Sequence, residues 1–96
     1  MAAYIIADVQ VTDFAGFQAY QDQVGATLTP YAGKFVVRGG RTEVLEGGYE
    51  PHRLVMLEFP SYGQAKLWYE SPGYAALIPH RQRTSRASII LMEGTA

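Results

Sequence analysis

The sequence predicts an α+β domain whose strands and helical regions follow the order βαββαβ. Four short runs rich in aliphatic residues are typical of strands, two intervening segments carry helical spacing or helix caps, and Gly and Pro mark the boundaries. At 96 residues the chain has the size of one domain, residues 1–96. By the split βαβ rule, these elements form a ferredoxin-like sandwich: one antiparallel sheet with both helical regions on one face.

The first strand and helix occupy the N-terminal third. Residues 4–11, YIIADVQV, are almost continuously apolar and rich in β-branched residues, as in a strand. Thr12 and Asp13 can cap a following helix. Its apolar residues recur at spacings of three and four along one stripe, until Pro30 and Gly33 stop it. The stripe consists of Phe14, Phe17, Tyr20, Val24 and Leu28.

A hairpin follows. The second strand is predicted from Lys34 to about Glu46, with an interruption at Gly39-Gly40, where missing side chains allow a bulge or a bend. Residues 47–51, GGYEP, form the turn. The third strand, residues 53–59, RLVMLEF, pairs with the second because a hairpin is the most local pairing available.

Two short helices joined by a kink lead to the last strand. Ser61 caps the first helix, with Gln64 as its capping-box partner three residues on. Ser71 caps the second, and Pro72 takes the first helical position, where its missing N–H is not needed. Residues 87–93, ASIILME, form the fourth strand.

Both faces of the predicted sheet are largely apolar. Side chains alternate across a strand, so one apolar set faces the helices and another faces away. The first set is Ile5, Ala7, Val9, Val55, Leu57 and Phe59, and the second is Tyr4, Ile6, Leu54 and Met56. The helices cover one face only, and monomers rarely leave a large apolar patch exposed. We therefore expect a homodimer formed sheet to sheet.

The second face also carries polar side chains: Asp8, Gln10, His52, Glu58 and, if the register of the second strand holds up to Gly39-Gly40, Arg38. A charge that faces an interior must be paired or hydrogen-bonded. We therefore expect Arg38 to pair with Glu58 or Asp8. Such a pair is either a structural ion pair or the polar end of a cavity.

Composition excludes several classes of function. The chain has no cysteine, so it has no disulfide, no thiolate nucleophile and no cysteine metal site. A net charge of −1 gives no long-range attraction for nucleic acid. The one basic cluster, His80, Arg81, Arg83 and Arg86, is interpreted as a solvated helix end, where cations complement the helix dipole.

No membrane or export signal is found in the sequence. No apolar run approaches the roughly 20 residues that span a bilayer. The N-terminal MAAYIIADVQ has no basic flank or cleavage-like segment. We therefore expect no membrane partner and a cytoplasmic location.

Three motifs carry a resemblance to a known family. They are RGG at residues 38–40, EFPS at residues 58–61, and WYESPGY at residues 68–74, which Arg81 follows. With the order of elements, they make nearly the whole chain resemble the family called domain of unknown function 1330. The matching positions are Arg38, Gly39, Gly40, Phe59, Pro60, Ser61, Trp68, Tyr69, Ser71, Tyr74 and Arg81.

The resemblance implies membership of the dimeric α/β-barrel superfamily. That superfamily includes cofactor-free monooxygenases, heme-degrading enzymes, relatives of chlorite dismutase, muconolactone isomerases and proteins with no known activity. Similarity of fold implies a dimer with an inner cavity and transfers no catalytic role to a residue of this chain.

The aromatic residues of the last helices are candidates for the cavity wall. Trp68 and Tyr69 are adjacent and point about 100° apart on a helix, so we expect Trp68 in the core and Tyr69 at the edge of a cleft. The hydroxyls of Tyr20, Tyr69 and Tyr74 need partners if buried. These tyrosines line the gap between helices and sheet, or they are boundary residues. The candidate ligand-binding residues are Tyr20, Arg38, Glu58, Tyr69, Tyr74 and Arg81.

Candidates for chemistry are fewer. Ser61 and Ser71 are explained as caps, and the two histidines show neither metal-ligand spacing nor the placement of an axial heme ligand, so no metal or cofactor is expected. Asp8 and His52 are weaker candidates for proton transfer. Asp8 and Glu58 would form an acid and base pair with a raised pKa if they approached each other on an inner face.

Three functions stay open. The first is a dimeric module that binds a small, partly apolar, acidic organic molecule near Arg38 and the tyrosines. The second is a cofactor-independent oxygenase or isomerase that uses Asp8, Glu58 or His52 for proton transfer. The third is a structural interaction protein without a cavity. An open pocket beside polar groups separates the first two from the third.

Overall fold

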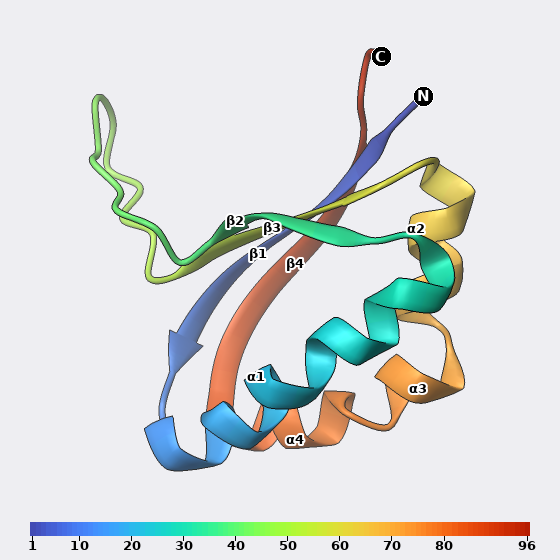
Figure 1. Ribbon diagram of the computed structural model, residues 1–96. Helices are drawn as coiled ribbons and strands as arrows, with labels where there is room; N and C mark the ends of the chain where they lie inside the picture. The colour runs from blue at the N-terminus through green and yellow to red at the C-terminus, as the bar shows by residue number, and fades with distance from the viewer.

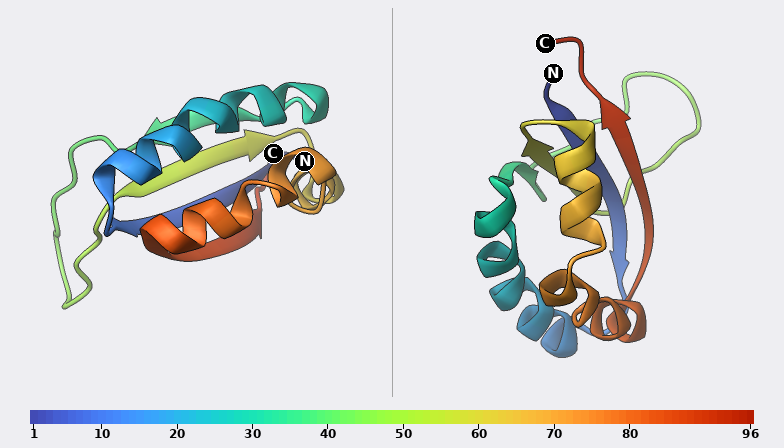
Figure 2. Two further views of the ribbon diagram at one scale, coloured as in Figure 1. Left: turned by 90° about the horizontal axis from the view of Figure 1, so that it is seen from below. Right: turned by 90° about the vertical axis from the view of Figure 1, so that its right-hand side faces the viewer.

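The strands form one antiparallel four-stranded sheet in the order β2-β3-β1-β4 in the computed structural model, which describes residues 1–96 (Figure 1). All helices lie on one face of this sheet (Figure 2, right). The elements are β1 (Ala3–Val11), α1 (Phe14–Leu28), a 3-10 turn η1 (Thr29–Tyr31), β2 (Lys34–Arg38), β3 (Leu54–Phe59), α2 (Tyr62–Tyr69), α3 (Pro72–Ala75), α4 (Ile78–Thr84) and β4 (Ser85–Glu93). The predicted ferredoxin-like α+β fold is confirmed.

The predicted helix caps are present. The side chain of Asp13 accepts a hydrogen bond from the Gly16 N–H at 3.1 Å, and Ser61 accepts one from the Gln64 N–H at 3.1 Å. The Ser71 hydroxyl accepts from the Tyr74 N–H at 3.4 Å. These bonds satisfy backbone donors that have no partner inside their own helix.

The last helical region differs from the prediction in one respect. Two short helices were expected, and the structure has three, because α4 follows α3 after a brief turn. Pro79 lies in the first turn of α4, where proline is tolerated. Arg81 therefore lies inside a helix that packs beside α1 rather than beyond the last helix.

The core fills the space between α1, α2, α3 and the sheet. Trp68, Tyr74 and Phe59 are the largest fully buried side chains, and the Trp68 indole N–H donates to the Thr27 hydroxyl at 3.0 Å. The placement of Trp68 in the core is confirmed. Phe14 does not join the buried stripe of α1, because this first helical residue lies beyond the packed elements and is 83% exposed.

The second strand is shorter than predicted. It ends at Arg38 instead of Glu46, and residues 39–53 form a loop, of which residues 40–50 are exposed and pair with no strand. Gly39 has a φ of 66°, outside the β region, and its N–H makes the last bond of the ladder, to the Leu54 carbonyl at 2.8 Å. The loop projects from the sheet in Figure 1 and bends past it, away from the helices, in Figure 2.

The irregularity in the second strand is present, but not at the predicted position. The register shifts between Phe35 and Val37, not at Gly39-Gly40. Lys34 pairs with Glu58 before the shift, and Arg38 pairs with Val55 after it. One extra residue moves every later side chain to the opposite face. Arg38 therefore faces the helices, and its expected position on the outer face is wrong.

The face assignments of the residues in β1 and β3 are confirmed by the register. Ile5 lies opposite Leu57 and Leu91 on the helix-facing side, and Ile6 lies opposite Met56 and Ile90 on the outer side. The outer side remains open in the single chain: Ile90 and Met92 are 53% and 50% exposed. None of the helices has both the length and the apolar character needed to cross a membrane.

Candidate functional site

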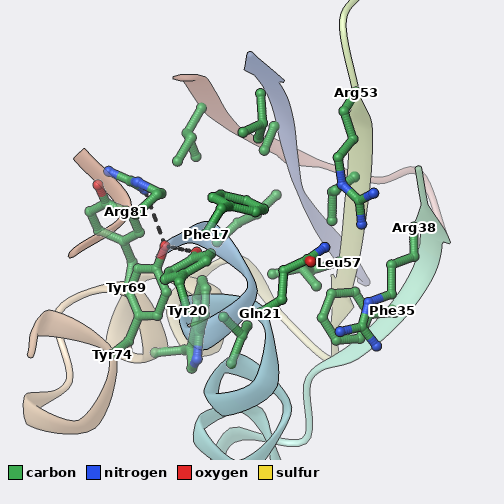
Figure 3. Close-up of a pocket in the computed structure, with 17 residues that line it drawn as sticks. Phe17, Tyr20, Gln21, Phe35, Arg38, Arg53, Leu57, Tyr69, Tyr74 and Arg81 are labelled. Carbon is green, nitrogen blue, oxygen red and sulfur yellow. Dashed lines mark hydrogen bonds between the residues drawn. The ribbon is translucent and has the colours of Figure 1, made fainter. Parts of the chain in front are cut away.

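A narrow pocket lies between α1 and the helix-facing side of the sheet (Figure 3). Thirteen of its 17 lining residues are hydrophobic, and the other four are Gln21, Arg38, Arg53 and Arg81. Small side chains such as Ala7 form part of the sheet wall, opposite Phe17 of α1. The free volume is about 60 Å³, room for a few water molecules or a slim organic group.

A wider hollow of about 470 Å³ adjoins this pocket. The two share Val9, Phe17, Gln21 and Arg53 in their walls, and the hollow is also bordered by the start of the β2–β3 loop. The pocket therefore opens to solvent at its Arg53 end. The remaining residues around the hollow are Gln10, Val11, Phe14, Gly39, Gly40 and His52.

The opposite, deep end of the pocket carries a chain of hydrogen bonds. The Arg81 Nη1 donates to the Tyr74 hydroxyl at 3.1 Å, and the hydroxyls of Tyr74 and Tyr20 are 2.7 Å apart. Burial raises the pKa of the Tyr20 hydroxyl, and the adjacent Tyr74 hydroxyl raises this pKa further. Tyr20 is therefore neutral at physiological pH and keeps a proton to donate.

Arg81 does not belong to a solvated helix end. Its side chain is only 6% exposed, and its Nε is buried with no hydrogen-bond partner in the protein. His80 is also partly buried, with its Nε2 2.6 Å from the Gly16 carbonyl oxygen, whereas Arg83 and Arg86 are exposed. The predicted basic cluster is thus divided between the pocket and the surface, and its interpretation as one solvated group is wrong.

The open end of the pocket carries the other two arginines. The Arg38 guanidinium carbon lies 4.1 Å from the centre of the Phe35 ring, a cation–π contact. The Arg53 guanidinium packs against Gly39, where an added Cβ would lie 2.6 Å from the Arg53 Nη1. The Arg53 Nε is also buried without a partner.

None of these arginines has an acidic partner. The ion pairs of the structure join Lys34 to Glu58 at 3.4 Å and His52 to Asp8 at 3.7 Å. The expected pairing of Arg38 with Glu58 or Asp8 is therefore wrong, because the register shift moves Arg38 to the other face. The pocket lining has three guanidinium groups and no carboxylate, so its electrostatic potential favours an anion.

Asp8 anchors the β2–β3 loop on the outer side. The Tyr49 hydroxyl donates to one carboxylate oxygen, and the His52 N–H donates to the other at 2.9 Å. The hydrogen bond from Tyr49 lowers the pKa of Asp8 and, with that from His52, outweighs the effect of burial. Asp8 lies opposite Leu54 and Glu58 opposite Tyr4, so the two carboxylates do not form the expected pair with a raised pKa.

The structure brings together most of the candidate ligand-binding residues. Tyr20, Arg38, Tyr69, Tyr74 and Arg81 line one pocket, whereas Glu58 and Asp8 lie outside it. His52 borders only the outer hollow.

Sequence reasoning missed Arg53, Gln21, Phe17 and Phe35 as lining residues. For two of these residues, the sequence spacing could have predicted a place in the pocket. Arg53 precedes Val55 by two positions and therefore shares its face, and Gln21 follows Phe17 by four positions on α1.

The chemistry that the pocket offers is donation of hydrogen bonds between apolar walls. Its polar groups are guanidinium, hydroxyl and amide, and its lining has no carboxylate, imidazole or amine to accept a proton. No three residues of the types His, Asp and Glu gather where they could hold a metal ion. The arrangement suits recognition of an oxygen-rich, partly apolar molecule.

Comparisons with known proteins agree with the fold. A family model described as a domain of unknown function, DUF1330, matches residues 2–95. No curated protein sequence matches the chain.

Several solved structures are similar. RPA0582 from Rhodopseudomonas palustris, a protein of unknown function, has 17% identity and a TM-score of 0.77, over 99% of this chain and 83% of that one. SnoaB from Streptomyces nogalater, a cofactor-independent oxygenase, has 13% identity and a TM-score of 0.67, over 99% and 94%. A dimeric, ferredoxin-like protein of unknown function from Bacteroides fragilis has 10% identity and a TM-score of 0.65, over 97% and 96%. At these identities the likeness shows the fold alone.

Proposed function

The chain belongs to the family described as domain of unknown function 1330, and we propose that this member binds a small organic anion in the pocket between α1 and the sheet. One observation carries the proposal: three arginines line an otherwise apolar pocket, and none of them has a carboxylate partner. Arg38 is exposed, but Arg53 and Arg81 are partly or fully buried. A guanidinium taken out of water is costly unless it is paired, so a nearby anion would stabilise these two.

The open end of the pocket is the proposed anion site. Arg38 and Arg53 come from adjacent strands and lie at the same end in Figure 3. Each guanidinium has five N–H donors in a planar fork that matches a carboxylate, and a bidentate contact is the strong form of this bond. The apolar part of the ligand would lie against Phe17 and Leu57.

The dimensions restrict the ligand. The inner pocket has only about 60 Å³ of free volume, whereas the hollow outside it has about 470 Å³. A bulky molecule would keep its bulk in the hollow and pass a slim, apolar part into the pocket. The proposed ligands are therefore small carboxylic acids with an unbranched or flat body.

We also propose that two chains associate through the outer side of the sheet. This side presents Ile6, Met56, Ile90 and Met92, and no element of the chain covers them. The similar protein from Bacteroides fragilis is dimeric. A second copy is the simplest partner that would remove this surface from water.

The two other functions have less support. The enzyme hypothesis depended on Asp8, Glu58 and His52 for proton transfer, and none of these lines the inner pocket. A purely structural role requires no pocket and leaves the unpaired arginines without a reason. Binding therefore explains more of the site than either alternative.

The test is ligand binding by calorimetry and thermal shift. Acids from butanoate to octanoate and benzoate are compared with the matching amides, using wild type, Arg53→Met and Arg38→Met. Because neither arginine has a carboxylate partner, each substitution leaves no acid unpaired. Arg41→Met is the matched control, since Arg41 is exposed and lines neither cavity.

We expect at least one acid to bind and its amide not to bind. Arg53→Met should weaken binding by about 1.5–3 kcal/mol, or roughly 10- to 100-fold, as for loss of a hydrogen bond to a charged group. Arg41→Met should bind like wild type. The proposal is overturned if no acid binds, or if the Arg53 and Arg38 variants bind acids as tightly as wild type.

A further inference from the structure

The deep end of the pocket has polar groups that the anion site does not use. Tyr20, Tyr74 and Arg81 lie at one end of the pocket in Figure 3, and Arg38 and Arg53 lie at the other. The deep end is well shielded from water, since Tyr74 is 1% exposed and Arg81 is 6% exposed. Apolar side chains such as Leu57 and Phe17 separate the two ends.

We propose that this deep end binds a second, neutral oxygen of the same ligand, so that the ligand is an organic acid with a hydroxyl or carbonyl group at its far end. The inference rests on the proposed function, because the acid group of the ligand is placed at Arg38 and Arg53. The inference adds the chemical class of the ligand group that lies opposite the acid group.

The hydrogen-bond chain of Arg81, Tyr74 and Tyr20 allows the Tyr20 hydroxyl to act as a donor in the pocket. The Tyr74 oxygen accepts a hydrogen bond from the Arg81 guanidinium, and the hydroxyl oxygens of Tyr74 and Tyr20 lie 2.7 Å apart. In the proposed complex Tyr74 donates to the Tyr20 oxygen, which leaves the Tyr20 O–H free to donate to a ligand oxygen. Tyr20 lines the pocket and is neutral, so this proton is present at physiological pH.

A second donor at the same end lacks a partner. The Nε of Arg81 is buried and makes no hydrogen bond within the protein, although nearly all such buried groups in folded proteins are satisfied. The Nε of Arg53, at the other end, has the same property. Each buried Nε marks a guanidinium whose hydrogen-bonding capacity the chain itself does not fill.

The cost of desolvation determines which oxygen group of the ligand binds at each end of the pocket. Burying a carboxylate costs far more than burying a hydroxyl or a carbonyl group. Arg38 is exposed at the open end, where a carboxylate keeps part of its hydration, while the deep end is enclosed. The charged group therefore belongs at the open end and the neutral group at the deep end.

The test compares pairs of acids that differ only at the far end. Each pair is an unbranched ω-hydroxy acid and the methyl-ended acid with the same number of heavy atoms, in a series of increasing length. Dissociation constants are measured by calorimetry for wild type, Tyr20→Phe and Tyr62→Phe. Tyr62 is exposed and lines neither cavity, so its variant is the matched control.

At one chain length we expect the ω-hydroxy acid to bind wild type roughly tenfold more tightly than its methyl-ended partner, as when a buried donor gains its acceptor. This preference should disappear in Tyr20→Phe and persist in Tyr62→Phe. If Tyr20→Phe does not fold, the comparison in wild type still decides the question.

The outcomes separate the two proposals. If methyl-ended and ω-hydroxy acids bind equally at every length, the deep end binds no ligand oxygen and this inference is wrong, while the anion site stands. The same conclusion follows if the preference survives in Tyr20→Phe. If no acid of either kind binds, the proposed function itself fails.

Discussion

The helix-facing side of the sheet and the outer side both carry alternating apolar residues, but their polar side chains differ in whether they have charged partners within the chain. On the outer side, Glu58 pairs with Lys34, and Asp8 accepts hydrogen bonds from Tyr49 and His52. On the helix-facing side, the arginines of the pocket have no acidic partner. Donors without partners in the pocket support the proposed ligand site, whereas the charges of the outer side are neutralised within the chain.

The same comparison separates two kinds of partner. The outer side is broad, apolar and open, which suits the flat surface of a second chain. The helix-facing side retains only a narrow pocket beside a hollow, which suits a small molecule. Four substitutions, described from the largest expected effect to the smallest, test this division.

Trp68→Ala should have the largest effect on the free energy of unfolding. The indole fills the core between α2 and the sheet and also bonds Thr27, so its loss creates a cavity and leaves a hydroxyl without its donor. We expect a loss of about 3–5 kcal/mol, measured by urea unfolding. Leu67→Ala, at an exposed position of the same helix, should cost much less, and equal losses would contradict the assigned core.

Ile90→Lys should dissociate the proposed dimer. Ile90 lies on the outer side, and a lysine there would place an unpaired charge between two sheets at a cost of about 3 kcal/mol or more, roughly 100-fold in the dimer dissociation constant. Light scattering after size-exclusion chromatography measures the mass. Gln82→Lys, at an exposed position of α4, should remain dimeric, and a monomeric wild type at micromolar concentration would disprove the dimer.

Gly39→Val should destabilise the chain more than Gly48→Val. Gly39 has a positive φ, and a side chain there would also strike the Arg53 guanidinium, whereas Gly48 has open space around it. We expect about 1–3 kcal/mol for Gly39→Val and under about 0.5 kcal/mol for Gly48→Val. Similar melting temperatures for the two variants would show that Gly39 does not position Arg53.

Asp8→Asn should have the smallest effect, and that effect should depend on pH. The pKa of Asp8 is lowered in the folded chain, so its stabilising contribution is complete above the unfolded value of about 3.9 and is lost as the pH falls through the lowered value. Melting temperatures of wild type and variant should therefore differ at pH 7 and converge at the lowest pH values. A constant difference in melting temperature across this pH range would show that the charged Asp8 carboxylate does not anchor the loop.

Local signals in the sequence predicted most of the fold. The caps at Asp13, Ser61 and Ser71 depend on residues three positions apart, which is why they could be recognised without the structure. The faces of β1 and β3 followed from strict alternation. The angle between neighbouring residues on a helix indicated that only one of Trp68 and Tyr69 faces the core, and Trp68 was favoured for that position.

The wrong predictions have a different cause, because the correct placement of these residues depends on contacts between segments far apart in the sequence. The bulge between Phe35 and Val37 contains no glycine, so nothing in the sequence signalled that Arg38 changes face. Arg81 looked like a surface cation until α4 packed beside α1 and buried it. Residues 39–46 include Thr42 and Val44, which favour strands, but they have no neighbour to pair with, and pairing rather than propensity decides whether a strand forms.

The most direct test of the central claim uses isoleucines on opposite sides of the same strands. Ile5 and Ile89 line the pocket, whereas their neighbours Ile6 and Ile90 lie on the outer side. We would label the isoleucine δ1 methyl groups and titrate the chain with the tightest-binding unbranched acid, following methyl chemical shifts by NMR. The account predicts saturable shifts for Ile5 and Ile89, little change for Ile6 and Ile90, and a titration midpoint roughly 10- to 100-fold higher in Arg53→Met. Shifts confined to Ile6 and Ile90, or equal titration midpoints in wild type and Arg53→Met, would contradict it.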